Sequence, residues 1–149
     1  MEKEENYELI EKIIISIDGI YEMSKIDYSE IEVFISNEKL IVDIKAILIN
    51  ISQFAKKIDL DIFENKDLKL FNKLVSLDKY SNSKLSNKKN IYNLTYSREL
   101  ALINIRLLEI QNEKFGKKIN KEELNLLKKL NKVTKVTFKN MIIAQRFRS

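Results

Sequence analysis

The sequence predicts an all-α protein, a single compact bundle of roughly five to seven helices. Proline is absent and glycine occurs only at positions 19 and 116, whereas a β-rich domain of this length normally needs more turn glycines. Apolar residues recur three or four positions apart along most of the chain, as on one face of a helix. The length of 149 residues fits one domain over 1–149 that needs neither disulfide nor metal to fold.

Three apolar stripes predict the first helices of this bundle. They consist, in chain order, of Ile10, Ile13, Ile14, Ile17, Ile20 and Tyr21, of Leu40, Ile41, Ile44, Ile47, Leu48, Ile51, Ala55 and Ile58, and of Leu68, Phe71, Leu74 and Val75. Each repeats at helical spacing, so each is expected to face a common core.

Residues 29–44 allow two interpretations. Apolar and polar residues alternate over 31–35 and again over 40–44, and Asn37 lies between them, as in a β-hairpin. The longer stripe that starts at residue 40 favours a helix beginning near Asn37, and Ser29 with Glu32 fits the start of a short helix before it. We expect the helical form, with the hairpin as the alternative.

The stretch 90–115 is apolar on two faces. One face holds Tyr96, Leu100, Ile103, Leu107 and Ile110, and the other holds Leu94, Ala101, Ile105 and Leu108. A helix of this kind usually lies in the middle of a bundle, so we expect the other helices to pack around it. Gly116 follows at the position of a left-handed C-terminal cap, and Asn120 with Glu123 predicts the start of a last helix. The polar residues 81–90 predict a mobile loop before this stretch.

The composition excludes several chemistries. Without cysteine there are no disulfides, thiolate metal sites or cysteine nucleophiles. Without histidine the chain lacks the commonest general base and the commonest metal ligand among side chains. We therefore expect a protein that is not an enzyme, with no cofactor, no metal site and no catalytic residue.

The apolar runs are short and the first residues are acidic. No apolar run exceeds four residues, whereas a membrane-spanning helix needs about twenty. A signal peptide begins with basic residues, but residues 1–5 are acidic. We expect a cytoplasmic protein, in a bacterial or an infected-cell cytosol, and no membrane partner.

Charge is distributed unevenly along the chain. Residues 1–78 hold 10 Lys/Arg and 17 Asp/Glu, whereas residues 79–149 hold 17 Lys/Arg and 5 Asp/Glu. The abundance of isoleucine, asparagine and lysine is typical of an AT-rich genome, which weakens the net charge of +5 as an indication of an anionic partner. Codon bias would enrich lysine everywhere, so it does not explain the asymmetry.

The basic residues near the C-terminus are the candidate binding site for an anionic partner. If 120–147 is one helix, six of its cations share a face, opposite an apolar face. With three more at its start, the candidates are Lys114, Lys117, Lys118, Lys121, Lys128, Lys132, Lys135, Lys139 and Arg146. Such a face suits an acidic protein or the phosphates of a nucleic acid, although it is also typical of an ordinary solvated helix. The β-branched run 133–137 weakens the assumption of a continuous helix.

Two other sets of charged residues are expected to have structural rather than functional roles. The acidic run Asp59, Asp61, Glu64 and Asp67 lacks the spacing and the central glycine of a calcium loop, and it has the wrong sign for a DNA-binding helix-turn-helix. Arg106 and Glu109 are three positions apart and can form an ion pair on a helix surface. An acid–base pair is the functional alternative for the second set.

The two-faced stretch 90–115, which ends at Phe115 and Gly116 and precedes an expected helical hairpin, resembles the small Bcl-2-like proteins of large DNA viruses. This resemblance implies a helical domain that binds host signalling proteins, and it assigns no residue a role. In composition the chain is also similar to small helical proteins of phages and plasmids, many of which bind nucleic acid or block a host protein.

Together these observations predict a non-enzymatic interaction module that binds another macromolecule, in the first place a protein, from a virus, phage or mobile element. The first alternative is a low-specificity nucleic-acid-binding protein that uses the basic C-terminal helix, and the second is a viral Bcl-2-like inhibitor of host signalling. The opposite charge of the two halves also allows a homo-oligomer.

Overall fold

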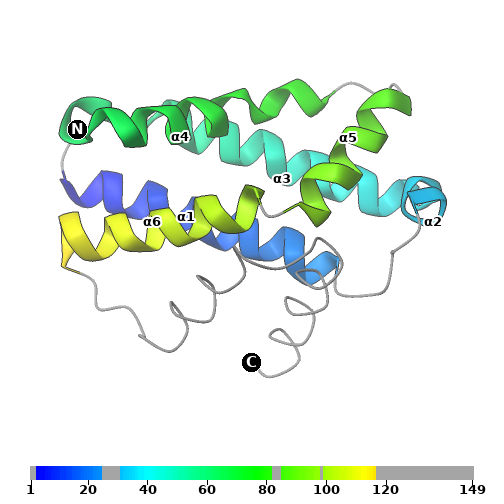
Figure 1. The fold of residues 1–149 in the computed structure, drawn as a ribbon, viewed down its shortest axis with the longest axis horizontal. Coiled ribbons are helices and arrows are strands. Elements are labelled where there is room, and N and C mark those ends of the chain that lie inside the picture. The colour runs from blue at the N-terminus through cyan, green and yellow to red at the C-terminus, as the bar shows by residue number, and fades with distance from the viewer. Residues whose placement is uncertain (1–2, 25–30, 82–84, 98, 117–149) are drawn as a thin grey trace.

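The computed structural model of this chain describes residues 3–24, 31–81, 85–97 and 99–116. Within these ranges the chain forms six α-helices and two short 3₁₀ helices, and no strand (Figure 1). The elements are α1 (Lys3–Met23), α2 (Ile31–Ser36), α3 (Glu38–Lys56), η1 (Leu60–Ile62), α4 (Asn65–Val75), η2 (Ser76–Ser81), α5 (Leu85–Tyr96) and α6 (Glu99–Phe115). The prediction of an all-α helical bundle is confirmed.

Helix α1 packs antiparallel to both α3 and α6. Lys12 lies 5.7 Å from the ring centre of Phe54 on α3, while Asn6, earlier in α1, bonds to the backbone of Asp59, just past the end of α3. Position numbers therefore rise along α1 as they fall along α3. The same relation holds for α6, because Tyr7 contacts Phe115 with ring centres 5.7 Å apart and hydrogen bonds join later positions of α1 to earlier ones of α6.

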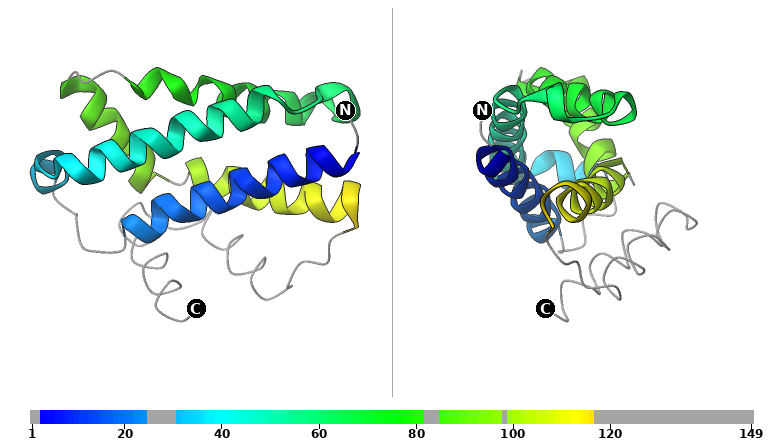
Figure 2. Two further views of the ribbon diagram at one scale, coloured as in Figure 1. Left: turned by 180° about the vertical axis from the view of Figure 1, so that it is seen from behind. Right: turned by 90° about the vertical axis from the view of Figure 1, so that its left-hand side faces the viewer.

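Helix α4 closes the bundle by packing between α3 and α6. It packs against α3, and two ion pairs, Arg106 with Asp67 and Lys73 with Glu99, tie it antiparallel to α6. The segments α1, α3, α4 with η2, and α6 run along the long axis and surround a common interior in the end-on view (Figure 2). This is the up-and-down arrangement of a four-helix bundle.

The interior is filled mainly by branched aliphatic side chains at helical spacing. All members of the first predicted apolar stripe, from Ile10 to Tyr21, are buried. Those of the second apolar stripe, from Leu40 to Ile58, are also buried, except Ile47, which is half-buried. The largest fully buried side chains are Phe34, Phe71, Ile10, Ile13, Ile17, Ile20, Ile41, Ile44, Leu48, Ile51 and Leu74. The predicted stripes therefore do meet in one core.

Residues 31–56 are helical, so the hairpin alternative is wrong. Asn37 separates α2 from α3, and its side-chain oxygen accepts a hydrogen bond from the backbone N–H of Leu40 at 3.0 Å. This is the N-cap bond that begins a helix, and it stands where a hairpin would turn. Phe34 of α2 then packs edge-on against Tyr92 and Tyr96 of α5, at 5.3 and 5.9 Å between ring centres, so α2 and α5 cover one end of the bundle.

The two-faced stretch 90–115 is not one central helix. It is divided into α5 and α6 at Ser97, whose hydroxyl donates to the carbonyl of Leu94 and accepts from the N–H of Glu99. A serine that bonds to the backbone in this way competes with continued helix. Helix α3 contacts α1, α2, α4, α5 and η2, so α3, rather than the two-faced stretch, lies against most of the other elements.

Much of the predicted loop 81–90 is helical. α5 begins at Leu85, and residues 82–84 lie outside the described ranges. Asn87 donates a hydrogen bond to the carbonyl of Tyr80, and Lys88 pairs with Glu38 at 2.9 Å. These polar side chains therefore hold the first turn of α5 against η2 and α3, contacts that a polar composition does not reveal.

The end of α6 is as predicted. Gly116 has a φ of 72° directly after the last helical residue, the left-handed conformation that a C-terminal cap requires. The predicted last helix, 120–147, lies outside the described residues. No helix within the described ranges is long and apolar enough to cross a membrane.

The buried ring of Phe71 provides a test of this core. We expect Phe71→Ala to lower the free energy of unfolding by about 3–5 kcal/mol, because the change leaves a cavity between α4 and its neighbours. The exposed Lys69 on the same helix supplies the control, and Lys69→Ala should change stability by less than about 0.5 kcal/mol. Urea unfolding followed by circular dichroism measures both, and equal effects would contradict the assigned packing.

Candidate interaction surface

Only one of the predicted binding residues lies in the part of the chain that the structure describes. Lys114 is half-buried in the last turn of α6, where a cation interacts favourably with the helix dipole. The other candidates, Lys117, Lys118, Lys121, Lys128, Lys132, Lys135, Lys139 and Arg146, lie outside the described residues. Their common face therefore stays a prediction.

The outer side of α1 carries acidic residues that the sequence analysis did not single out. One face of this helix carries five carboxylates and one apolar side chain at positions spaced three or four apart. We name this face the α1 stripe, and it consists of Glu4, Glu8, Glu11, Ile15, Asp18 and Glu22. Ile15, near its middle, is 60% exposed, the highest value among the exposed large apolar residues of the described ranges. The spacing of these acidic residues is visible in the sequence. The apolar stripe on the opposite side of the same helix is the stronger periodic signal, however, and it indicates only a buried face.

Two carboxylates of the α1 stripe bond to buried amides of α6. Gln111 donates through Nε2 to Oε2 of Glu11, and Asn104 donates through Nδ2 to Oδ1 of Asp18 at 3.3 Å. Both amide side chains belong to buried residues. One edge of the α1 stripe therefore faces α6, and its other members point away from the core.

The second apolar face predicted for α6 consists of Ala101, Ile105 and Leu108. Ala101 belongs to the core cluster, and Leu108 is partly buried and packs against that cluster. Ile105 is 5% exposed. The second predicted face of α6 is therefore also buried or partly buried.

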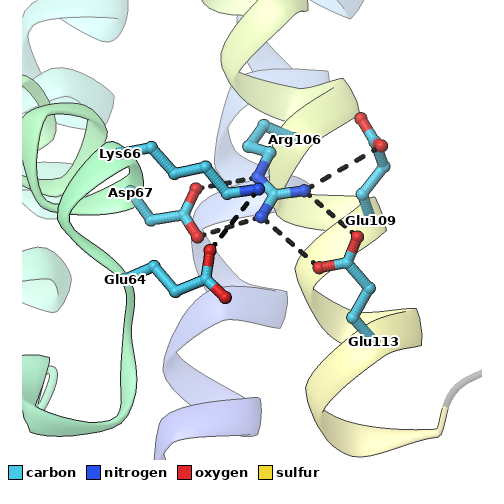
Figure 3. Close-up of polar contacts among 6 residues, drawn as sticks. All are labelled: Glu64, Lys66, Asp67, Arg106, Glu109 and Glu113. Atoms are coloured by element: carbon cyan, nitrogen blue, oxygen red, sulfur yellow. Dashed lines mark hydrogen bonds and ion pairs between the residues drawn. The ribbon is translucent and has the colours of Figure 1, made fainter.

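The most concentrated group of charges in the described residues lies between α4 and α6. Arg106 forms two parallel hydrogen bonds to Asp67, from Nε to Oδ1 at 2.8 Å and from Nη2 to Oδ2 at 2.9 Å. Its remaining side contacts Glu113 at 3.3 Å and Glu109 at 3.9 Å (Figure 3). The side chain of Asp67 is 2% exposed and that of Arg106 is 20% exposed, so this is a nearly buried pair with a wet outer edge.

The geometry keeps both partners of this pair charged. The hydrogen bond from Arg106 lowers the pKa of Asp67, while burial opposes the shift. The same bond raises the pKa of Arg106 above its already high value. An arginine held in this way does not exchange protons near neutral pH, so the cluster joins α4 to α6 and offers no acid–base pair.

The acidic run from 59 to 67 is used locally. Asp59 accepts a hydrogen bond from the N–H of Asp61 at 3.1 Å and so begins η1, whereas Asp67 faces Arg106. Glu64 pairs with Lys66 at 3.5 Å. Among the described residues no three carboxylates gather in a way that could hold a metal ion.

No family model, curated protein or solved structure matches this chain. The resemblance to Bcl-2-like proteins accordingly gains no support from known folds. Its principal feature, one long two-faced helix, is divided at Ser97, and the hairpin that should follow it lies outside the described residues.

The Arg106 cluster predicts unequal effects from its two sides. We expect Arg106→Met to lower the free energy of unfolding by about 3 kcal/mol, because it leaves Asp67 buried without its partner. Glu113→Gln changes only the exposed edge, so the loss should stay below about 0.5 kcal/mol. Urea unfolding at neutral pH separates the two, and a larger effect of Glu113→Gln would contradict the assignment.

The same pair predicts a pH dependence of stability. Because the pKa of Asp67 lies lower in the folded protein than in the unfolded chain, where it is about 3.9, its stabilisation is complete above that value and is lost as the pH falls through the folded pKa. Replacing both partners by Asp67→Leu and Arg106→Met removes this dependence. Unfolding measured between pH 7 and pH 2 should show a steeper loss below pH 4 in the original protein than in the double variant.

Proposed function

We propose that this chain is a non-enzymatic interaction module that binds the acidic surface of another protein through its basic C-terminal residues. The observation that carries the proposal is the concentration of charge. Residues 117–149 hold ten Lys/Arg and two Asp/Glu, whereas residues 1–116 hold 17 Lys/Arg and 20 Asp/Glu. A surplus of cations at one end of a chain attracts an oppositely charged partner and speeds its association.

The ion pairs within the bundle support this proposal, because several cations of the bundle are already paired with its own carboxylates. Lys56 pairs with Asp78, Lys73 with Glu99 and Arg106 with Asp67, and each pair joins two elements of the bundle. These cations contribute to the internal connections of the fold. The surplus after Gly116 is the part of the positive charge that we assign to a partner.

A low-specificity nucleic-acid-binding protein is the second candidate, since lysines that neutralise phosphates bind without reading sequence. The predominance of lysine over arginine, 23 to 4, does not favour base reading, in which bidentate arginine is common. The two candidates differ in how binding depends on salt. Contacts to six phosphates would weaken binding by orders of magnitude between about 50 and 200 mM salt.

We expect the variant with Lys128, Lys132, Lys135 and Lys139 all changed to Glu to bind an acidic peptide at least about tenfold more weakly. The control changes four exposed lysines of the bundle to Glu, namely Lys57, Lys69, Lys79 and Lys89, and so alters the net charge equally. Fluorescence anisotropy with a labelled poly-glutamate peptide and with duplex DNA, each at 50 and 200 mM salt, measures the effect. An equal loss in the control would refute the proposed site, and a steep salt dependence with preference for DNA would favour the second candidate.

A further inference from the structure

Two leucines, Leu70 of α4 and Leu102 of α6, lie between the two ion pairs that join these helices. Leu70 is half-buried and stands three positions from the paired residue on either side of it, Asp67 and Lys73. Leu102 is 41% exposed, and it stands three and four positions from its paired neighbours in α6. Residues at this spacing share a helical face, so the two leucines lie at the same height on the side where α4 and α6 meet.

The two helices carry opposite charges around these leucines. The outward side chains on this side are cations on α4 and carboxylates on α6, and all are exposed or half-buried: Lys66, Lys69 and Lys73 on α4, and Glu99, Glu109 and Glu113 on α6. Figure 3 shows part of this arrangement, with Lys66 extending from α4 and with Glu109 and Glu113 extending from α6. We name the two leucines and these six charged residues the α4–α6 face.

We propose that the α4–α6 face binds the same face of a second copy of this chain. A half-turn about an axis between the two copies, parallel to both helices, places α4 of each copy over α6 of the other at the same height. The lysines of α4 then face the carboxylates of α6 twice, and Leu70 of each copy meets Leu102 of the other. Such an interface is isologous, because the same residues take part on both sides. The inference uses none of the basic C-terminal residues, so it does not depend on the proposed function.

The ion pairs within one copy leave these groups able to bind a second copy. The side chains of Lys73 and Glu99 are 54% and 35% exposed, and those of Lys66 and Glu113 are 64% and 48% exposed. An ammonium group has three donors and a carboxylate accepts at both oxygens, so each group can add a partner on its exposed side. Lys69 is exposed as well and points toward the second copy in this arrangement.

The leucines supply the apolar centre that such an interface needs. Interfaces between proteins are depleted of charge at their centre and polar at their rim, which is the arrangement of the α4–α6 face. Ile15 on the α1 stripe is more exposed, but carboxylates flank it along that stripe, so a second copy bound there would oppose like charges. From Glu99 to Glu113 the face runs about 21 Å along α6. This is the scale of a small interface, so we expect reversible pairing.

Sedimentation velocity of the full chain at about 10–500 µM tests this pairing, because copies joined by a small interface dissociate within that range. We expect the average sedimentation coefficient to rise with concentration. Leu102→Asp should raise the dissociation constant at least about tenfold, because it places a charge at the apolar centre. The matched control is Val42→Asp, which changes a 58% exposed residue of α3 outside the face, and it should leave the dissociation constant within about twofold.

An exchange of charges tests how the two copies are arranged. The variant with Lys66→Glu and Lys69→Glu makes α4 acidic like α6, and the variant with Glu109→Lys and Glu113→Lys makes α6 basic like α4. Each variant alone should stay monomeric, because like charges then face each other. An equimolar mixture of the two should associate, because α4 of each variant faces an α6 of opposite charge in the other. Unchanged circular dichroism spectra establish that the variants fold.

Three results would overturn the proposal. The first is an original protein that stays monomeric over the whole concentration range. The second is an equal effect of Leu102→Asp and Val42→Asp on association, which would assign the pairing to another surface. The third is a mixture of the two charge variants that stays monomeric.

Discussion

Burial of the long apolar stripe of α3 is the constraint on which the other helices depend. Ile41, Ile44, Leu48 and Ile51 are almost completely removed from solvent, and α3 contacts α1, α2, α4, α5 and η2. A single helix cannot bury such a stripe, since the hydrophobic effect grows with the apolar area covered. The antiparallel placement of α1 and α4 beside α3 supplies that cover, and α6 closes the bundle opposite it.

Polar contacts then fix how the helices align. A core of isoleucine and leucine tolerates many arrangements of similar volume, whereas hydrogen bonds have defined distances and directions. Asn6 bonds to the backbone of Asp59 in both directions, and Arg106 grips Asp67 with two parallel bonds. Sliding α1 along α3, or α6 along α4, would leave these buried groups without partners. The apolar residues make the bundle compact, and these few polar residues select one register.

The fold shows where many acidic residues of the N-terminal half lie. The acidic residues of the N-terminal half are not spread evenly over the surface, because five of them line the outer side of α1. The basic residues of 117–149 follow directly on α6, whose last turn lies beside the first turns of α1.

The sequence by itself determined the helical class, the buried residues of α1 and α3, the N-cap at Asn37 and the left-handed Gly116, because helical periodicity and capping are local properties. It did not reveal the division at Ser97 or the helical start of α5, since these depend on contacts with Leu94, Glu99, Tyr80 and Glu38. The pairing of Asp67 with Arg106 joins positions 39 apart in the chain, and local patterns carry no information about such distant partners. Only the tertiary structure decided that the acidic residues of α1 face outward beside α6, because helix packing determines which side of α1 is left for solvent.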